Sequence, residues 1–272
     1  MPVPVRPNAP RRVGAAPKTR WKDPPAVTDS PADDPKPGFR SDVTVELVKH
    51  TASDADVLFA ARVSTVGEQS LDELGKDPER SKGLINYLMR DRHGSPFEHN
   101  SMTFFISAPI FVFREFMRHR VGWSYNEESG RYRELQPVFY VPGESRKLVQ
   151  EGRPGKYVFV EGTQAQQEIV GRTMEDSYRR AYEAYQEMLA AGVAREVARA
   201  VLPVGLFSSM YATCNARSLM HFLGLRTQHE LAKVPSFPQR EIEMVGEKME
   251  AEWARLMPLT YAAFNANGRV AP

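Results

Sequence analysis

The sequence predicts a single α+β (mixed α/β) domain with a long central helix and a sheet rich in antiparallel strands. Strand-like segments of alternating apolar residues and helix-like segments of three-to-four-residue period follow each other without strict βαβ alternation. One helix-like segment, residues 164–191, is much longer than the others. A hydrophobic content of 42% in 272 residues is enough to build a core.

Residues 1–40 differ from the rest of the chain in composition. They hold ten of the 21 prolines, with eight Lys or Arg against four Asp. Such a segment buries too little apolar surface to fold, so we expect a disordered, Pro-rich extension, followed by one folded domain in residues 41–272. The sequence leaves open whether the extension is a dispensable linker or a binding arm.

Charge and cysteine content narrow the classes of function. The chain carries +2 overall and residues 1–40 carry +4, so residues 41–272 sum to −2. A generally positive surface for nucleic acid is therefore not expected. The absence of both a long apolar run and a signal-peptide pattern predicts no membrane insertion and a cytoplasmic location. A single cysteine, Cys214, and no clustered histidine motif predict no metal site.

Alternation of apolar and polar residues predicts the strands, most clearly at Val43, Val45 and Leu47. The expected strands cover residues 43–50, 101–108, 138–141 and 206–213. Glycine, proline and polar residues between these segments predict loops at 91–97 and 121–131, and an irregular, exposed stretch at 147–162.

Apolar residues at helical spacing, together with capping residues, predict the helices. Ser53 and Asn215 can act as N-caps, Pro78 suits a first turn, and Gly192 ends the longest helix. The expected helices cover residues 53–64, 78–89, 109–120, 164–191, 194–203 and 215–225, and a last helix has Ile242, Val245, Met249 and Trp253 on its inner face.

Cationic side chains follow the apolar helix that begins at Pro109. Arg118, His119 and Arg120 are consecutive, so on a helix they would point about 100° apart and could not share one surface face. Guanidinium forks suit phosphates, and a glycine such as Gly130 lets backbone N–H groups approach an anion. One basic residue at a helix C-terminus can also simply complement the helix dipole, and Ser124 with Glu127 can form a capping box.

The segment RHRVGWSYNEESGRY resembles the signature of flavin-dependent thymidylate synthases, in which Arg-His-Arg precedes Ser-x-Arg by seven or eight residues. Eight residues separate the two parts here. Three further segments resemble the same family in the same order, namely HGSPFEH at 93–99, REVARAVLP at 195–203 and NARSLMHFLGLR at 215–226. Together these segments cover most of residues 90–230.

The resemblance implies a homotetramer with a thymidylate synthase-complementing fold and active sites shared between subunits. It implies methylation of dUMP to dTMP, with methylenetetrahydrofolate as the carbon donor and FAD, reduced by NADPH, as the hydride source. Residues 41–272 would form the catalytic domain. No Gly-x-Gly-x-x-Gly fingerprint follows a strand, so a Rossmann crevice for FAD is not expected.

Site residues carried over from the family fall into two sets. Those at FAD positions are Ser95, Arg118, His119, Arg120, Glu127, Asn215, Ala216, Arg217 and His221. Those at nucleotide positions are Glu115, Arg118, Glu127, Glu128, Ser129, Gly130, Arg131, Arg199 and Arg226. Glu115 departs from the glutamine of many members. Taken alone, Arg199, Arg217, Arg226 and His221 could equally be ordinary solvated or packed helix residues.

The resemblance also implies that no protein nucleophile takes part and that Arg226 stabilises an electron-rich, N3-deprotonated uracil. The only thiol, Cys214, lies in a strand-like run where cysteine is usually a small buried hydrophobe. Two other classes remain open on the sequence. One is a flavoenzyme that acts on another pyrimidine nucleotide, and the other is a non-enzymatic nucleotide- or RNA-binding module.

Overall fold

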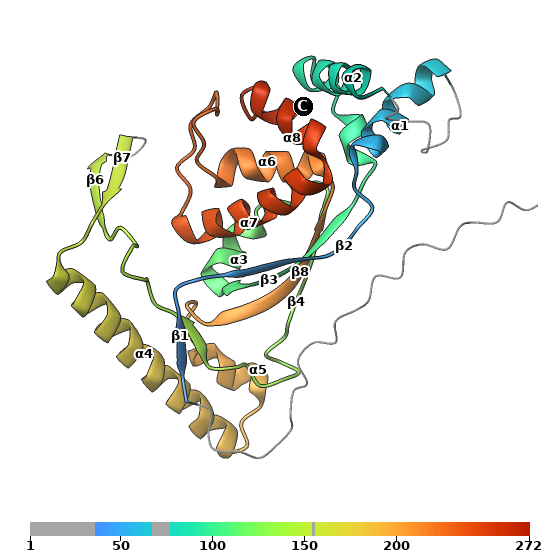
Figure 1. Ribbon diagram of the computed structural model, residues 1–272. Coiled ribbons are helices and arrows are strands. Elements are labelled where there is room, and N and C mark those ends of the chain that lie inside the picture. The colour runs from blue at the N-terminus through green and yellow to red at the C-terminus, as the bar shows by residue number, and fades with distance from the viewer. Residues whose placement is uncertain (1–35, 67–76, 154–155) are drawn as a thin grey trace, which may run out of the picture. The chain divides into compact units, whose positions relative to one another are not determined.

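A computed structural model describes residues 36–66, 77–153 and 156–272 of the chain. Its centre is a four-stranded antiparallel sheet in the order β2-β3-β8-β4 (Figure 1). The strands are β2 (Thr44–His50), β3 (Met102–Pro109), β8 (Phe207–Cys214) and β4 (Trp123–Glu127). The antiparallel α+β prediction is confirmed, as are the strands predicted at 43–50, 101–108 and 206–213.

The prediction of a loop at 121–131 is wrong for its middle part. β4 pairs with β8 over five residues, from Trp123 opposite Cys214 to Glu127 opposite Met210. Trp123 and Tyr125 alternate with Ser124 and turn their rings toward the core, where they pack against Phe116. The segment is polar because it is an edge strand with one face away from the core, and its own alternation was the overlooked signal.

Helices cover the sheet and enclose the main hydrophobic core. In Figure 1, α6, α7 and α8 gather near one face of the sheet. Trp253, Phe97, Phe104 and Phe222 are among the fully buried side chains that they and the sheet enclose. The helices of this layer are α1 (Asp54–Val66), α2 (Pro78–Arg90), the 3₁₀ helix η2 (Ser95–Glu98), α3 (Ile110–Phe116), α6 (Ala216–Arg226), α7 (Arg240–Leu256) and α8 (Pro258–Ala266).

Three elements of this layer differ from the prediction. The helix predicted at 109–120 ends at Phe116, and the freed carbonyls of Phe116 and His119 accept the Tyr125 hydroxyl at 3.1 and 2.8 Å. The turn η2 occupies part of the loop predicted at 91–97. The helix α8 was not separated from α7, although Pro258 at its first turn marks the boundary.

A second core lies under the long helix α4 (Gln164–Ala190), which a Thr163–Gln166 capping box begins. Phe139 of β5 (Val138–Tyr140) stacks on Tyr178 of α4 with ring centroids 4.9 Å apart. The short helices α5 (Arg195–Ala198) and η3 (Arg199–Val201) close this cluster. The helix predicted at 194–203 is shorter in the structure, because α5 and η3 together end at Val201 and Pro203 follows closely.

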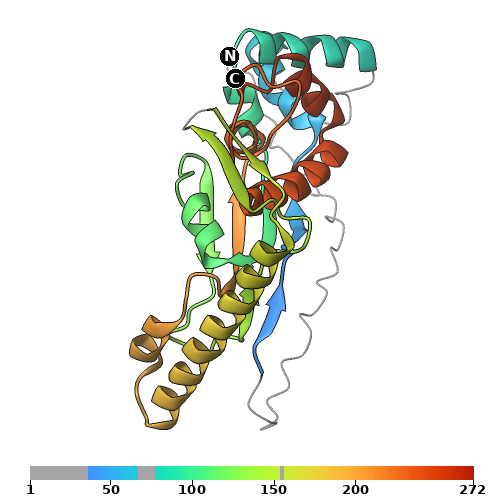
Figure 2. The same cartoon turned by 90° about the vertical axis from the view of Figure 1, so that its left-hand side faces the viewer.

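Two further segments differ from prediction. β1 (Gly38–Arg40) pairs in parallel with β5, so the last three residues of the predicted disordered extension are ordered, while residues 1–35 lie outside the described part of the chain. β6 (Val149–Arg153) and β7 (Lys156–Val160) form an antiparallel hairpin where an irregular stretch was predicted (Figure 2). Pairing between the two strands stabilises this hairpin, although the composition of the segment does not predict strands.

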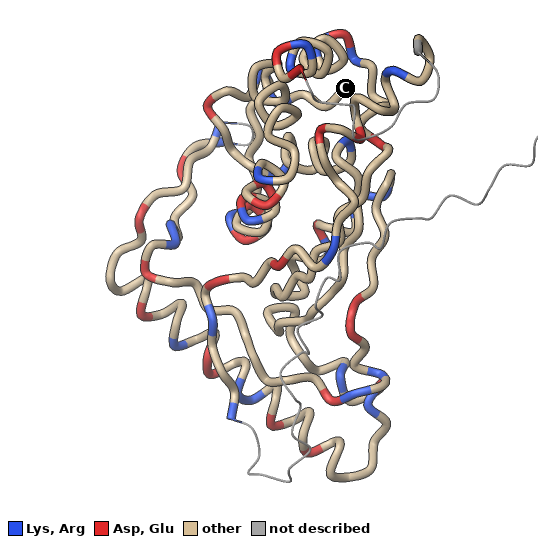
Figure 3. The backbone as a smooth tube through the Cα atoms, turned by 45° about the vertical axis from the view of Figure 1, so that its right-hand side comes forward, with Lys and Arg blue, Asp and Glu red and all other residues tan. Residues whose placement is uncertain are grey.

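Charged residues are interspersed along the described chain, with basic and acidic positions alternating along α4 (Figure 3). Within that part of the chain no helix is long and apolar enough to cross a membrane. Nor do three His, Cys, Asp or Glu side chains in the described ranges gather closely enough to hold a metal ion.

A carboxylate of α1 caps α8 across 205 residues of sequence. Asp54 accepts hydrogen bonds from Leu259 N at 2.9 Å, from Thr260 N at 2.9 Å and from Thr260 Oγ1 at 2.6 Å. Asp54→Ala leaves these donors without a partner, so we expect the free energy of unfolding to fall by about 3 kcal/mol. Urea denaturation at one protein concentration measures the change. Asp176→Ala on the exposed face of α4 is the control, with an expected change within about 0.5 kcal/mol.

Candidate functional site

The site is built where β4 meets the start of α6. Asn215 caps α6 by accepting from Ser218 N at 2.9 Å, and Ser218 Oγ donates to Val121 O at 2.9 Å. Gly122 has a φ of +70°, and a Cβ at this position would lie 2.1 Å from Ser218 Oγ. The turn after Arg118-His119-Arg120 is therefore fastened to α6, and only glycine fits at its closest point.

Arg226, His119 and Glu115 form one cluster between the end of α3 and the end of α6. Arg226 makes an ion pair with Glu115, and its Nε donates to His119 Nε2 at 3.2 Å. Both partners of the ion pair are largely buried, with 22% and 24% of their side chains exposed. The His119 ring lies edge-on to Phe222, with centroids 4.9 Å apart. The structure thus joins three of the predicted residues.

Burial, and then the positive charge of Arg226 and the interaction with His221, lower the pKa of His119 from 6.5 to about 4. His119 is therefore neutral near pH 7, with Nε2 as the acceptor and Nδ1 as the donor. The unfolded chain binds this proton near pH 6.5, so acidification from there toward pH 4 favours unfolding. Burial also raises the pKa of Glu115, Arg226 opposes that shift, and the carboxylate of Glu241 adds to it.

A second cluster surrounds Arg217 at the first turn of α6. Arg217 Nη1 contacts Glu98 Oε1 at 2.5 Å, and its Nε donates to the Pro272 carbonyl at 2.6 Å. A Cβ on Gly94 would lie 2.5 Å from Arg217 Cζ, so the chain before the exposed Ser95 passes directly over the guanidinium. Burial, and then Arg217, lower the pKa of His221 one turn further along. The helix α6 connects this cluster, at its first turn, with the Arg226 cluster at its last turn.

Ala216 belongs to the same region, because its N–H donates to Asn100 Oδ1 at 2.8 Å. The Ala216 side chain is fully buried, so Ala216 can position neighbouring groups only through its backbone. The side-chain oxygen of Asn215 likewise accepts the hydrogen bond that caps α6. These two predicted residues therefore fix the position of the start of α6.

A third group lies beyond the other end of β4. A Cβ on Gly130 would meet Leu135 Cδ1 at 2.8 Å and Arg199 Cδ at 3.2 Å, so Gly130 and Arg199 are neighbours despite their separation in sequence. Arg131 Nε binds Glu196 Oε2 at 2.6 Å, which ties the same loop to α5. The Ser129 hydroxyl accepts from Arg131 N at 3.3 Å.

The two glutamates that precede this loop are fixed to β8. Glu127 Oε1 accepts from Ser208 Oγ at 2.8 Å, and Glu128 N donates to Ser209 O at 2.9 Å. The Gly130–Arg131–Arg199 group therefore follows the Glu127 end of β4, whereas the turn of Arg118–Arg120 precedes the Trp123 end, which pairs at the α6 end of β8.

Arg118 and Arg120 differ from the other predicted arginines. Both are exposed, and their guanidinium groups contact no carboxylate among the described residues. By contrast Arg131, Arg217 and Arg226 are each paired with a glutamate. The turn after α3 thus presents two uncompensated cations beside a neutral histidine, which is an arrangement suited to a large anionic ligand.

Comparison with known proteins decides the family. The model of the family described as thymidylate synthase complementing protein matches residues 46–259. Relatives from Streptomyces avermitilis and Streptomyces coelicolor, both named flavin-dependent thymidylate synthase, are 93% and 88% identical over 90% of this chain and all of their own length. The chain belongs to this family. The resemblance predicted from the sequence is confirmed.

Two solved structures also match the fold of this chain. They are crystal structures of a UMP/dUMP methylase, PolB, from Streptomyces cacaoi, bound with 5-Br UMP and 5-Br dUMP. Their TM-scores are 0.80 and 0.81, with 56% and 57% identity, and each match covers 88% or 86% of this chain and all of the solved chain.

The donor set fits the flavin that the family name implies. A flavin dinucleotide needs cations for its pyrophosphate and neutral polar groups for its ring edge. Arg118 and Arg120 are uncompensated, Arg217 lies under a chain that only Gly94 allows to pass so closely, and His119 is a neutral imidazole. These residues would hold the cofactor between the turn after α3, η2 and the start of α6.

The sequence did not predict one polar network next to the Arg226 cluster. Glu241 Oε1 accepts from Tyr140 Oη at 2.6 Å and from Arg146 Nε at 2.8 Å, and Glu241 is 2% exposed. Arg146 and Tyr140 hold the pKa of Glu241 below its ordinary value despite burial. Arg146 lies close to the segment predicted to be irregular, and no spacing pattern connects it with Glu241, so only the fold could reveal this group.

The charges around His119 can be tested by titration. Arg226→Gln removes a nearby cation, so the pKa of His119 should rise from about 4 but stay below 6.5, because burial is the larger cause of its shift. NMR titration of histidine-labelled protein measures this value. Arg217→Gln is the matched comparison, since it should raise the pKa of His221. Titration of wild-type His119 near 6.5 would contradict the geometry described.

Proposed function

We propose that this protein methylates dUMP to dTMP, with methylenetetrahydrofolate as the carbon donor and FAD, reduced by NADPH, as the hydride source. The observation that carries the proposal is the cluster of Arg226, neutral His119 and Glu115 next to the uncompensated Arg118 and Arg120. The names of the relatives and the 5-Br dUMP bound by PolB support the same substrate.

The nucleotide phosphate would be held by the third group. Gly130 has no side chain between the loop backbone and Arg199, while Ser129 and Arg131 add a hydroxyl and a guanidinium. Arg131 is paired with the exposed carboxylate of Glu196. A phosphate would replace this carboxylate as the partner of Arg131. Glu127 and Glu128, fixed to β8, set the register of the loop.

Arg226 would act on the uracil ring. Its guanidinium stays protonated at any pH of interest, so it stabilises negative charge and does not accept a proton. In the unliganded chain that positive charge is directed at Glu115. The base must therefore either displace Glu115 or share Arg226 with it.

When bound, reduced FAD would supply the hydride that converts the transferred methylene group to a methyl group. No thiolate is available to activate the uracil. Cys214 is 2% exposed, lies between β3 and β4 in the centre of the sheet, and has its pKa raised by burial. The proposal therefore includes no protein nucleophile, and it leaves activation of the ring to Arg226 and the reduced cofactor.

We also propose a homotetramer in which different subunits complete each site. In its support, the turn of Arg118–Arg120 and the group of Gly130 and Arg199 lie at opposite ends of β4. Exposed apolar side chains flank both groups, with Val121 89%, Leu225 63% and Tyr132 78% exposed. Residues 41–272 would be the catalytic domain, and synthesis from a free nucleotide pool would place the enzyme in the cytoplasm.

UMP is a second candidate substrate, because the solved neighbour PolB is described as a methylase of both UMP and dUMP. The two nucleotides differ only at the ribose 2′ position, so the same uracil and phosphate contacts would serve either. Parallel assays with UMP and dUMP decide between them, and a higher kcat/KM for UMP would replace dUMP in the proposal.

Two variants separate the proposed chemistry from a thiolate mechanism. Purified protein with FAD, NADPH and methylenetetrahydrofolate should form dTMP from dUMP, and Arg226→Ala should lower kcat/KM by about a hundredfold or more. Cys214→Ala should stay within about threefold of wild type. Arg255→Ala, an exposed arginine of α7, is the control. Loss of dTMP formation in the cysteine variant, with flavin absorbance retained, would overturn the mechanism.

Mixing two inactive variants tests whether sites are shared. If Arg131 and Arg226 of one site come from different subunits, co-expression of Arg131→Ala and Arg226→Ala chains should restore about a quarter of the activity, because that share of sites receives both intact residues. Mixtures that stay as inactive as the separate variants would show that both residues of a site come from one chain.

A further inference from the structure

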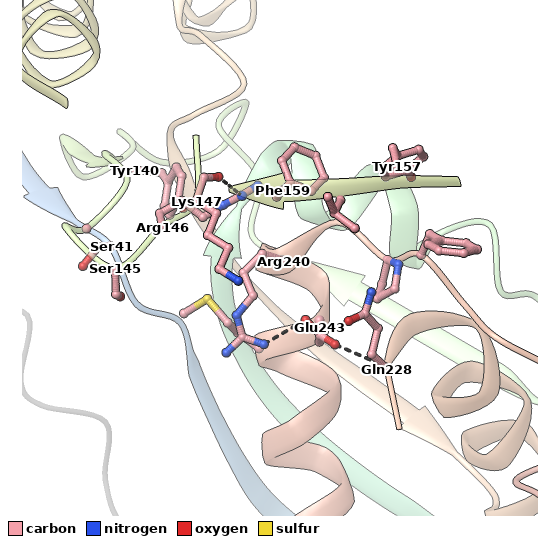
Figure 4. Close-up of a pocket in the computed structure, with 15 residues that line it drawn as sticks. Ser41, Tyr140, Ser145, Arg146, Lys147, Tyr157, Phe159, Gln228, Arg240 and Glu243 are labelled. Carbon is pink, nitrogen blue, oxygen red and sulfur yellow. Dashed lines mark hydrogen bonds and ion pairs between the residues drawn. The ribbon is translucent and has the colours of Figure 1, made fainter. Parts of the chain in front are cut away.

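The two ends of α6 have different surroundings. The chain that leaves its last turn borders a cavity of about 560 Å³ between the β6–β7 hairpin and the start of α7, which Lys147, Tyr157 and Phe237 help to line (Figure 4). The first turn, which carries Arg217, is instead contacted by residues 268–272, which follow α8 and are named the α8 tail. The α8 tail takes no part in the proposed mechanism, although it contacts a residue predicted to bind the flavin.

The α8 tail lies against α6. A Cβ on Gly224 of α6 would lie 3.1 Å from the backbone oxygen of Arg269, so the tail passes close to the helix backbone. At its other end Pro272 is buried, and the Pro272 carbonyl accepts from Arg217 Nε at 2.6 Å. The tail therefore contacts α6 both near its last turn and at its first turn.

A buried ion pair fixes the start of the α8 tail. Arg269 is 3% exposed, and its guanidinium donates to the two carboxylate oxygens of Glu250 in α7 at 2.6 and 2.8 Å. It also donates to Thr227 Oγ1, at the end of α6, at 3.1 Å. A bidentate pair of this kind holds both partners in one geometry. The tail thus leaves α8 from a fixed point.

Arg92 fixes the middle of the α8 tail. Its Nη1 donates to the backbone oxygens of Val270 at 2.7 Å and Ala271 at 3.0 Å. These are the only acceptors that the Arg92 side chain contacts among the described residues. The backbone of Arg92 has a φ of +63°, which is uncommon for a residue other than glycine and persists where surrounding contacts favour it. Its contacts with the tail are the ones that use this exposed side chain.

The contacts of Arg217 leave part of its guanidinium available. Nε donates to the Pro272 carbonyl and Nη1 donates to Glu98, so two of the three nitrogens are bound by protein groups and the plane of the guanidinium is set. Nη2 contacts no acceptor within the described ranges. An arginine fixed in this way loses little further side-chain freedom when a ligand binds, which favours affinity.

We propose that the α8 tail is a positioning element for the flavin, in which Arg92 holds the tail and the Pro272 carbonyl holds Arg217 in the orientation that binds FAD. The inference rests on the proposed function, because it requires Arg217 to bind the flavin. Arg92 is then a positioning residue, which acts on FAD through the tail and Arg217.

Release of FAD from the holoenzyme tests the inference. Arg92→Asn introduces a residue that tolerates the left-handed backbone but lacks the guanidinium, and it should speed FAD release after dilution about tenfold, measured by flavin fluorescence. A chain without residues 270–272 should show the same change. Arg92→Lys keeps a cationic donor and should stay within about threefold of the wild type. Arg90→Ala removes a neighbouring exposed arginine that pairs with Asp91, and as the matched control it should release FAD at the wild-type rate.

A double variant separates positioning from a general loss of stability. In an Arg217→Gln chain, Arg92→Asn should not speed FAD release further, because its effect passes through Arg217. Additive effects of the two substitutions would overturn the proposal.

The pKa of His221 gives a readout that needs no flavin. Burial, and then Arg217, hold this pKa below its ordinary value. Displacement of Arg217 in the Arg92→Asn variant should raise the pKa of His221 part of the way to its value in Arg217→Gln, measured by NMR titration. The same pKa in Arg92→Asn and in the wild type would contradict the proposal.

The outcomes distinguish this inference from the proposed function. If dTMP forms and Arg92→Asn changes neither FAD release nor the pKa of His221, the α8 tail has only a structural part and the proposed function stands. If the wild type binds FAD and releases it faster once Arg92 is replaced, but forms no dTMP, the proposed function fails and the positioning of Arg217 stands.

Discussion

Pairing of β4 with β8 is the interaction on which the site depends. β8 runs directly into the cap of α6 at Asn215, so each residue of β4 has a fixed place relative to that helix. Trp123 at one end of β4 anchors the turn that carries Arg118, His119 and Arg120. Glu127 at the other end leads into the Gly130 loop beside Arg199. One short edge strand therefore sets the separation between the turn of Arg118–Arg120 and the Gly130 loop.

Ion pairs with glutamates govern the electrostatics of the unliganded chain. Arg131, Arg217 and Arg226 have carboxylate partners, and the last pair is the most buried. A partly buried arginine without a counter-charge would be costly, so Glu115 stabilises the Arg226 guanidinium in this position. The same burial keeps His119 neutral, which gives the cluster a hydrogen-bond donor and acceptor that do not change near pH 7.

Periodicity predicted most of the elements correctly because the sheet and helices have one clear buried face. The strands β2, β3, β5 and β8 and the helices α1, α2, α4 and α6 follow from alternation, helical spacing and caps such as Asn215. The errors lie in short segments whose order depends on a partner. β4 and the β6–β7 hairpin have polar or exposed faces, and their strands form because distant or adjacent backbone groups pair with them.

The sequence by itself determined the family and the residues at its motif positions, because side-chain type and spacing are local properties. Only the tertiary structure decided which residues meet. It paired Arg226 with Glu115, placed Gly130 against Arg199, and created a cavity from Lys147, Tyr157 and Phe237. These contacts join chain segments far apart in sequence, and the packing of β4, β8 and α7 fixes them, which no local pattern encodes.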